Sequence, residues 1–425
     1  MPAFRFKSFK NTYKPDSKVT RFLCVLTLYG MAYGLYRGIQ DNYLAEILGI
    51  TPFERGIVEF FRETPGILLV VFLALMYKLS DSRIFKIGVA LMTGGIIGLL
   101  VTSGGFFLSK ISVVFFMFLY STGEHICMPV RTSISLDLAK RETAGSSLGI
   151  TSAVSQFGQI TGFLLVMALF FLLNRLGVLG ASKSNIMGYR IVFGMSVALM
   201  IVSLMVVMAL KETTLKSQRR RFYFAKKFHK YYMLEVFYGA RKQIFLTFAP
   251  YVLILHYGAN PSIMSLLFAV CAGFGILFGP LTGKIIDKLG YKVVMVADTL
   301  ILIAVCFLYG FAHRLFPPGI AFIVVCVNFV LDSIISLASM ASNVYVQRIA
   351  SSKEEIAATL STGISVNHII SIFIALLGGW IWNVTGIEVL FSLSAFMGLL
   401  NSIYAATIKK SEEQLQGDLL VKKTV

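Results

Sequence analysis

Charged residues are scarce in this sequence. Only 14% of its 425 residues are Asp, Glu, Lys or Arg, whereas 56% are hydrophobic, and the mean hydropathy is +0.77. A soluble chain of this length would form two or three domains and would carry far more charge on its surface. Apolar runs of roughly 20 residues, the length that crosses a bilayer as a helix, recur along the chain instead. The composition therefore excludes a soluble protein and predicts an all-α protein with many membrane spans.

Cysteine is also rare, and motifs of catalysis are missing. The sequence has no nucleophile–base–acid set, no nucleotide-binding loop and no metal-ligand spacing. We therefore expect no enzymatic activity, no cofactor and no metal site. The cysteines stand singly inside apolar runs without CxxC spacing, which excludes a disulfide framework; they are Cys24, Cys127, Cys271, Cys306 and Cys326.

Acidic residues are outnumbered, with 21 Asp and Glu against 39 Lys and Arg, which gives a net charge of +18. Such an excess can indicate nucleic-acid binding, but here most basic residues fall on the side of the predicted spans that both termini share. This asymmetry follows the positive-inside rule and places both termini in the cytoplasm. No small-residue cleavage site follows the basic N-terminus, so we interpret it as a retained tail. We expect a bacterial-type plasma (inner) membrane, a lipid bilayer as partner, and no nucleic acid.

Twelve spans can be drawn, in two sets of six separated by a basic segment. We predict a cytoplasmic tail at 1–21, a six-helix bundle at 22–210, a cytoplasmic linker at 211–230, a second six-helix bundle at 231–406 and a tail at 407–425. The linker either lies on the inner leaflet as an amphipathic segment or is a solvated connection. The spans are 22–48, 56–79, 84–103, 111–136, 145–173 and 190–210, then 231–257, 262–286, 293–311, 319–346, 356–382 and 387–406.

The two sets of spans repeat one another. Segments 28–52 and 237–261 share four positions at a constant offset, and two parallel six-helix halves are an architecture of secondary transporters. The charged positions of the first segment are not repeated, because Leu246 and Pro250 stand where Arg37 and Asp41 would be expected. The shared positions are Tyr29, Gly30, Gly49 and Pro52, which correspond to Tyr238, Gly239, Gly258 and Pro261.

The loop at 283–292, GKIIDKLGYK, resembles the G-x-x-x-D-[RK]-x-G-[RK]-[RK] signature of the major facilitator superfamily. The first-half copy at 77–86 keeps the acid and the basic flanks but has lost both glycines. The resemblance implies a monomer with twelve helices in two pseudo-symmetric bundles. It also implies a cytoplasmic gate, whereas a plain helix–helix turn is the alternative reading of the same residues. The implied gate residues are Asp81, Arg83, Gly283, Asp287, Lys288 and Gly290.

The fifth span contains part of a signature that is typical of proton-coupled drug exporters. Gly149, Gly158 and Gly162 have the spacing of that signature, but Phe163 replaces its proline and the final glycine pair is missing. Small residues at this spacing also allow two helices to pack closely. The pattern disfavours the exporter class.

Ionisable residues inside spans are costly, so they usually face a cavity. They concentrate here in spans one, two, four, seven, ten and eleven, and the resemblance implies that spans one, four, seven and ten line a central cavity. Carboxylates that are partly removed from water can take up protons near neutral pH. The proton-coupling candidates are Glu124, Glu63, Asp332 and Asp41, and the candidates for lining a solute cavity are Tyr33, Arg37, Gln40, His125, Arg241, Lys242, Gln243, Asn328, Asn367 and His368.

Some of these residues have a structural alternative. The pairs Arg37–Asp41 and Glu59–Arg62 have helical spacing and can simply neutralise each other, and His368 can be an interhelical hydrogen bonder. We predict a secondary transporter that moves a small organic solute by alternating access in symport with protons. The alternatives are a proton-coupled exporter of amphipathic compounds, and a membrane sensor or scaffold that does not transport.

Overall fold

The computed structural model describes residues 12–13, 16–103, 109–140, 143–177, 186–210 and 223–408, and helices make up most of them. The first half contains six long helices that alternate in direction. The first of them ends in a π-helical turn, η1. They are α2 (Ser17–Asn42) with η1 (Tyr43–Ile47), α3 (Pro52–Leu75), α4 (Asp81–Ser103), α5 (Lys110–Leu138), α6 (Ala144–Arg175) and α7 (Ile186–Met208).

The second half also alternates in direction and has one broken span. A 3₁₀ stretch, η3 (Ser336–Ser339), joins α11 (Pro318–Ile335) to α12 (Met340–Ile349), so that the two helices form a single span. With this span counted once, the described residues form twelve spans, as predicted. The other elements are η2 (Lys226–Phe228), α8 (His229–Tyr257), α9 (Pro261–Leu289), α10 (Tyr291–Leu315), α13 (Lys353–Thr385) and α14 (Ile387–Ala406).

The repeated Gly and Pro residues mark the same connection in each half. Gly49 and Gly258 have φ values of 58° and 68°, a left-handed conformation that glycine adopts without steric cost. Pro52 and Pro261 then occupy the first turns of α3 and α9, where proline's missing N–H would have no helical partner anyway. The repeat therefore encodes the stop of one helix and the start of the next.

Two helices, α3 and α8, are more polar than the other spans. Ten of the twelve spans are long and apolar enough to cross a membrane by length and composition alone, and these two are not among them. In α3 the acids and bases of the segment PFERGIVEFFRET fill the first half of the helix. Many of the charged side chains at the centre of the molecule come from α3 and α8. The composition of these two helices is therefore more polar than that of the surrounding helices.

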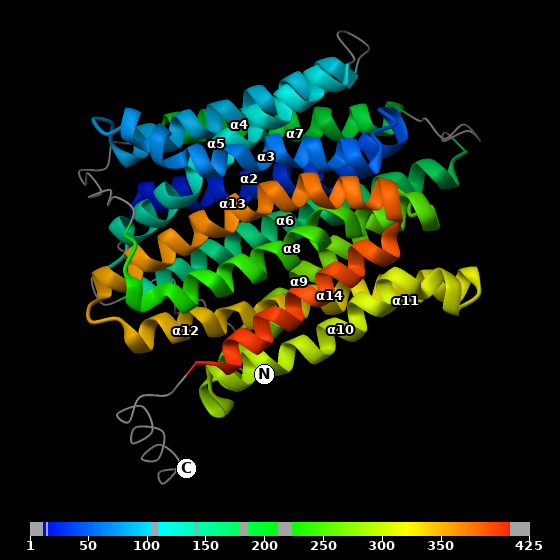
Figure 1. Cartoon of the computed structure of the whole chain (residues 1–425). Coiled ribbons are helices and arrows are strands. Elements are labelled where there is room, and N and C mark those ends of the chain that lie inside the picture. The colour runs from blue at the N-terminus through cyan, green and yellow to red at the C-terminus, as the bar shows by residue number, and fades with distance from the viewer. Residues whose placement is uncertain are drawn as a thin grey trace.

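The two halves pack against each other mainly through α3 with α13 and α6 with α9 (Figure 1). We call the end of the helices at which α2 begins the tail end, and the end at which α3 begins the far end. At the far end Asn42 donates a hydrogen bond of 2.8 Å to the carbonyl of Ala259, and Ser265 donates one of 3.0 Å to the carbonyl of Gly38. The halves are therefore in direct contact at the far end.

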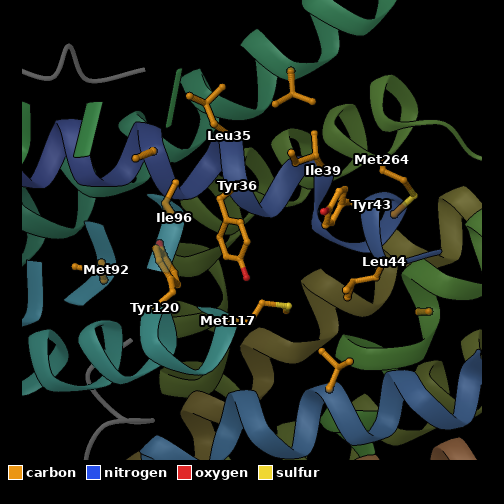
Figure 2. Close-up of a cluster of buried hydrophobic side chains, with 14 of the residues drawn as sticks. Leu35, Tyr36, Ile39, Tyr43, Leu44, Met92, Ile96, Met117, Tyr120 and Met264 are labelled. Atoms are coloured by element: carbon orange, nitrogen blue, oxygen red, sulfur yellow. The ribbon is translucent and has the colours of Figure 1, made fainter. Parts of the chain in front are cut away.

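The apolar core of the first half surrounds α2. The rings of Tyr36 on α2 and Tyr120 on α5 pack at a centroid distance of 4.7 Å, with Ile96 and Met117 beside them (Figure 2). In soluble proteins, burying one such side chain stabilises the fold by roughly 1.5–3 kcal/mol. Inside a bilayer, van der Waals contacts between closely packed helices hold them together instead.

Most observed helix boundaries differ from the predicted ones, by up to five residues, and three helix starts illustrate this. Helix α2 begins at Ser17, inside the predicted tail, because Asp16 caps it by accepting a hydrogen bond from the Lys18 amide. Helix α3 begins at Pro52 rather than at 56, because Thr51 and Glu54 form a capping box there. Helix α8 begins at His229, two residues inside the predicted linker. Most of the predicted linker, 211–222, and the tail at 409–425 lie outside the described residues, so the division into domains stays a prediction.

Candidate functional site

A cavity of about 550 Å³ lies between the two halves. Ligand pockets typically measure roughly 300–1,000 Å³, so this cavity is large enough for a small organic molecule. Its lining runs from the middle of the helices to Tyr231, near the start of α8 at the tail end. Eight predicted site residues line it: Tyr33, Glu63, Glu124, His125, Lys242, Gln243, Asn367 and His368.

Glu124 is the carboxylate of the cavity that has no polar partner. It lies on α5, and within the described part of the chain no hydrogen bond or ion pair to it is formed. Lys242 on α8 also has no ion-pair partner there; its ammonium lies 6.0 Å from the centre of the Tyr238 ring. A carboxylate and an ammonium that face open space in this way can bind solute groups or protons.

A chain of buried ion pairs closes the cavity on its far side. Arg37 contacts Asp41 at 2.6 Å, Asp41 contacts Arg55 at 3.1 Å, and Arg55 contacts Glu59 at 2.9 Å. Arg62 then bridges Glu59, at 2.6 Å, and Glu63. The chain alternates three guanidiniums with three carboxylates, so the buried charges balance, as buried ions must to avoid a large desolvation cost.

The second half joins this chain at two points. The side-chain amide of Gln243 on α8 donates a hydrogen bond of 2.9 Å to Glu59, and Nδ1 of His368 on α13 lies 2.8 Å from Oε2 of Glu63. We call the chain from Arg37 to Glu63, with Gln243 and His368, the polar network. It connects α2 and α3 of the first half to α8 and α13 of the second, so a displacement of one half against the other must break these contacts.

His125 lies beside this network with a fixed ring. Its Nδ1 donates a hydrogen bond of 2.8 Å to the carbonyl of Ser121, which leaves Nε2 without a proton in the neutral ring. The rings of His125 and His368 meet edge to face with centroids 5.2 Å apart. Two imidazoles and the Glu63 carboxylate thus meet at the wall of the cavity.

The cavity has a second polar region near the tail end, around Glu235. The carboxylate of Glu235 accepts hydrogen bonds of 3.2 Å from Ser342 on α12 and from Asn367 on α13. Residues Glu235, Tyr238 and Lys242 all line the cavity from α8. Their spacing of three and four residues places them on one face of the helix.

Sequence reasoning missed two of the charged residues in this region. Arg55 lies just outside the predicted span 56–79, although the capping box at Thr51 and the spacing of four residues to Glu59 both indicate a helical position. Glu235 is not among the predicted site residues, although it precedes Tyr238 and Lys242 on the same helical face.

Six predicted site residues lie away from the cavity lining. Arg37 and Asp41 belong to the polar network, and Gln40 is buried beside them on α2. The guanidinium of Arg241 lies 3.6 Å from Asp298 on α10 instead. Asn328 donates a hydrogen bond of 2.7 Å to the carbonyl of Val324 on its own helix, and Asp332 is half-buried on α11.

The predicted gate residues lie at the tail end. Asp81 begins α4 and accepts a hydrogen bond from Ser133 of α5, whereas Arg83 is exposed. The second-half residues Asp287 and Lys288 are exposed in the last turn of α9, which contains Gly283 in the preceding turn. Gly290 joins α9 to α10 with φ of 83°. In this structure Asp81 therefore connects two helices of one half, and the gating role stays a prediction.

The second half of the sequence matches the family model of the Major Facilitator Superfamily over residues 231–419. By this match the second half of the chain is similar in sequence to the major facilitator superfamily, the family that the loop at 283–292 resembles. The family match indicates a transporter rather than an enzyme, and the long apolar helices indicate a multi-pass membrane protein. No curated protein matches it in sequence.

Solved structures of several transporters have the same fold at low sequence identity. A mutant form of the nucleoside transporter NupG has a TM-score of 0.72 at 14% identity, with 92% of this chain and 100% of that chain covered. A D-xylose-proton symporter has a TM-score of 0.69 at 17% identity, with 93% and 98% covered. A bacterial homologue of the iron transporter ferroportin has a TM-score of 0.70 at 12% identity, with 92% and 98% covered.

Proposed function

We propose that this protein is a major facilitator transporter that moves a small polar organic solute through the central cavity by alternating access, in symport with protons. The observation that carries the proposal is the cavity between the halves, which combines an unpaired carboxylate, Glu124, with hydrogen-bonding groups from both halves. A solute held there contacts both halves at once. Its binding is therefore coupled to their relative position.

The lining favours a solute with a ring and several hydroxyl or amide groups. Tyr33, Tyr231 and Tyr238 offer ring faces and hydroxyls, and Gln243 and Asn367 offer amides. Such residues fix the orientation of polar ligands through a small number of directed hydrogen bonds. Two structural neighbours are a nucleoside transporter and a D-xylose-proton symporter, and nucleosides and D-xylose are compounds of this kind.

Glu124 is our candidate for the coupling proton. A carboxylate without a cationic partner can be neutralised by a proton, whereas Glu59 lies between two guanidiniums that keep it ionised. Glu63 is the second candidate, because its hydrogen bond with His368 crosses between the halves. A proton taken up at either residue changes the charge of the cavity at the place where the halves meet.

The described conformation corresponds to an inward-facing state in this proposal. The halves touch at the far end, and the cavity lining continues to the tail end, at which α2 begins. With both termini in the cytoplasm, as predicted from the positive-inside rule, the cavity faces the cytoplasm.

The test is uptake by proteoliposomes over a panel of nucleosides, pentoses, hexoses and amphipathic drugs, with and without an inward proton gradient. We expect one polar class to accumulate only with the gradient. Preferred extrusion of amphipathic drugs would favour an exporter. If no solute moves under any gradient although one binds, the chain is a sensor or scaffold and the proposal is wrong.

Replacing the coupling carboxylate tests its role directly. We expect Glu124→Gln to abolish accumulation driven by the proton gradient while exchange of solute across the membrane without a gradient survives, because the neutral amide mimics the protonated acid. Glu388→Gln is the matched control, since Glu388 pairs with His313 and Arg314 at the far end, away from the cavity. Unchanged accumulation in Glu124→Gln would remove Glu124 from the coupling role.

A further inference from the structure

Three potential metal ligands converge at the wall of the cavity, although no ligand spacing is visible in the sequence. Glu63 on α3, His125 on α5 and His368 on α13 each offer one ligand atom, and these atoms lie within 4.8 Å of one another. They come from three helices and both halves of the molecule, which is why the sequence motifs of metal sites did not reveal them. Among the described residues no other group of this kind occurs.

The donor set suits a divalent transition-metal ion. Two imidazole nitrogens with one carboxylate oxygen are a common set for Zn²⁺, which binds them at about 2.0–2.2 Å and accepts water as a fourth ligand. Donors at these lengths stand roughly 3.4 Å apart. Ligand atoms up to 4.8 Å apart would therefore need to approach each other by about 1.4 Å, whereas Glu63 Oε2 and His368 Nδ1, at 2.8 Å, would separate slightly. The fourth position can face the open cavity.

The ligand atoms are already oriented. The hydrogen bond from His125 Nδ1 to the Ser121 carbonyl directs the free Nε2 lone pair outward, and such a partner on the second ring nitrogen is the usual support of a ligating histidine. Arg62 holds one oxygen of Glu63, so that the other oxygen, Oε2, lies against His368 Nδ1 at 2.8 Å. A metal ion would take the place of the proton between these two atoms, and the proton would leave to water.

A glycine leaves the space that the ion needs. A Cβ atom placed on Gly66 would lie 2.9 Å from His368 Nδ1 and 3.0 Å from His125 Nε2, so both nitrogens point at the same empty volume beside α3. The charge balance also permits a cation. The guanidiniums and carboxylates of the polar network neutralise each other, and the remaining charged groups of the cavity, Glu124, Glu235 and Lys242, leave one excess negative charge.

We propose that Glu63, His125 and His368 form a binding site for Zn²⁺ or a similar divalent transition-metal ion. The bound ion ties α3 and α5 of the first half to α13 of the second half and so stabilises the described conformation. This binding does not depend on which organic solute the cavity accepts, so a failure of the transport proposal leaves it standing.

The experiment measures Zn²⁺ binding to the purified full-length protein in detergent, free of any polyhistidine tag and of bound metal. Titration calorimetry gives the affinity and the number of sites, and the absorption bands of bound Co²⁺ report the coordination geometry. We expect one site per chain, and at least about tenfold weaker binding in His125→Ala, His368→Ala and Glu63→Gln, each of which lacks one ligand.

His256→Ala is the control, because His256 lies near another histidine, His313, at a ring distance of 6.2 Å but outside the proposed site. Unchanged Zn²⁺ affinity in both His125→Ala and His368→Ala, or loss of Zn²⁺ binding in His256→Ala, would overturn the proposal. Because Glu63→Gln disturbs the polar network and can fail to fold, the two histidine variants decide the result on their own.

Gly66→Ala offers a test that removes no ligand. Its added methyl group would occupy the space between the two imidazole nitrogens, and we expect Zn²⁺ affinity to fall at least about tenfold, as it does when a ligand's support is lost. Gly275→Ala is the matched control, since Gly275 holds the corresponding position in the second half and a Cβ there meets nothing within 4 Å. Equal Zn²⁺ affinity in the two variants would contradict the assigned position of the ion.

Discussion

At the scale of single residues, the central charges have two kinds of environment. Arg55, Asp41 and Glu59 are almost fully buried, at 1–2% exposure, and each forms ion pairs with two charged residues of the polar network. Glu124 and Lys242 instead face the cavity without an ion pair among the described residues. Buried charges are tolerated when they are paired and hydrogen-bonded, so the first group holds the helices in place and the second group remains available to a solute or a proton.

Arg55 is the residue on which the balance of the network depends most. Arg55→Met would leave two guanidiniums for three carboxylates in a buried setting, and breaking a buried pair in this way costs about 3–5 kcal/mol. We expect a loss of about 3 kcal/mol in the free energy of unfolding, at the low end of this range, because Asp41 keeps Arg37 and Glu59 keeps Arg62. Unfolding of the purified protein in mixed micelles, followed by circular dichroism, measures this loss.

Arg314→Met provides the comparison for this prediction. Arg314 also pairs with a carboxylate, that of Glu388, but its side chain is 66% exposed, and exposed pairs contribute only about 0–1 kcal/mol. If the two variants lose the same stability, the polar network is not a buried structural unit.

At the scale of helices, glycines set the distance between α2 and α6. A Cβ atom on Gly34 would clash with the backbone of Gln159 and stand 3.0 Å from the Cα of Gly162, and one on Gly158 would stand 3.0 Å from the amide of Met31. Pairs of small residues four positions apart on both helices allow such close backbone contact. Gly158 and Gly162, two of the three glycines with the spacing of an exporter signature, therefore serve packing within the first half.

Substituting one of these glycines should separate the helices. We expect Gly158→Val to destabilise the protein by about 1–3 kcal/mol, the usual cost of overpacking, because the contacts it would meet are backbone atoms that cannot rotate away. Gly149→Val is the internal control on the same helix, since a Cβ at Gly149 meets nothing within 4 Å. The unfolding midpoint of each variant checks this, and a larger loss in Gly149→Val would argue against the packing role.

Local spacing made part of the site predictable. Helical spacing allows the pairs Arg37–Asp41 and Glu59–Arg62, which were one of two readings of these residues, and both ion pairs are present. The bond between Glu63 and His368 and that between Glu235 and Asn367 could not be predicted, because each depends on which helices pack together across the molecule. The π-helical turn after Asn42 also has no local signal in the sequence.

At the scale of the whole molecule, the sequence predicted the architecture better than the site. Ten spans follow from hydropathy, and the internal repeat follows from the Gly and Pro residues that end one helix and start the next. The cavity depends instead on how far apart the two halves stand at each end, a property that no segment of the sequence encodes alone. For this reason Asp332 and Arg241, which occupy predicted cavity-lining spans, lie away from the lining.

Alternating access requires the contact at the far end to open, and this can be tested by a disulfide. A Cβ atom added to Gly38 of α2 would lie 2.7 Å from Ser265 Oγ on α9. The sulfur of a cysteine at position 265 would therefore lie close to a cysteine side chain at position 38. The double variant Gly38→Cys with Ser265→Cys joins the two halves, in a background in which the five native cysteines are replaced by alanine. We expect oxidation to abolish uptake of the solute identified by the proteoliposome panel, and a reductant to restore it.

A second disulfide, placed inside one half, is the control. It distinguishes the effect of locking the two halves together from any general effect of a disulfide on uptake. The hydroxyls of Ser135 on α5 and Ser147 on α6 lie 2.8 Å apart, and both helices belong to the first half. Ser135→Cys with Ser147→Cys should form a disulfide equally well but leave uptake intact, because helices of one half keep their relative positions when the halves rock. Full uptake through the oxidised Gly38–Ser265 variant would mean that the far end need not open, and the rocking mechanism would be wrong for this protein.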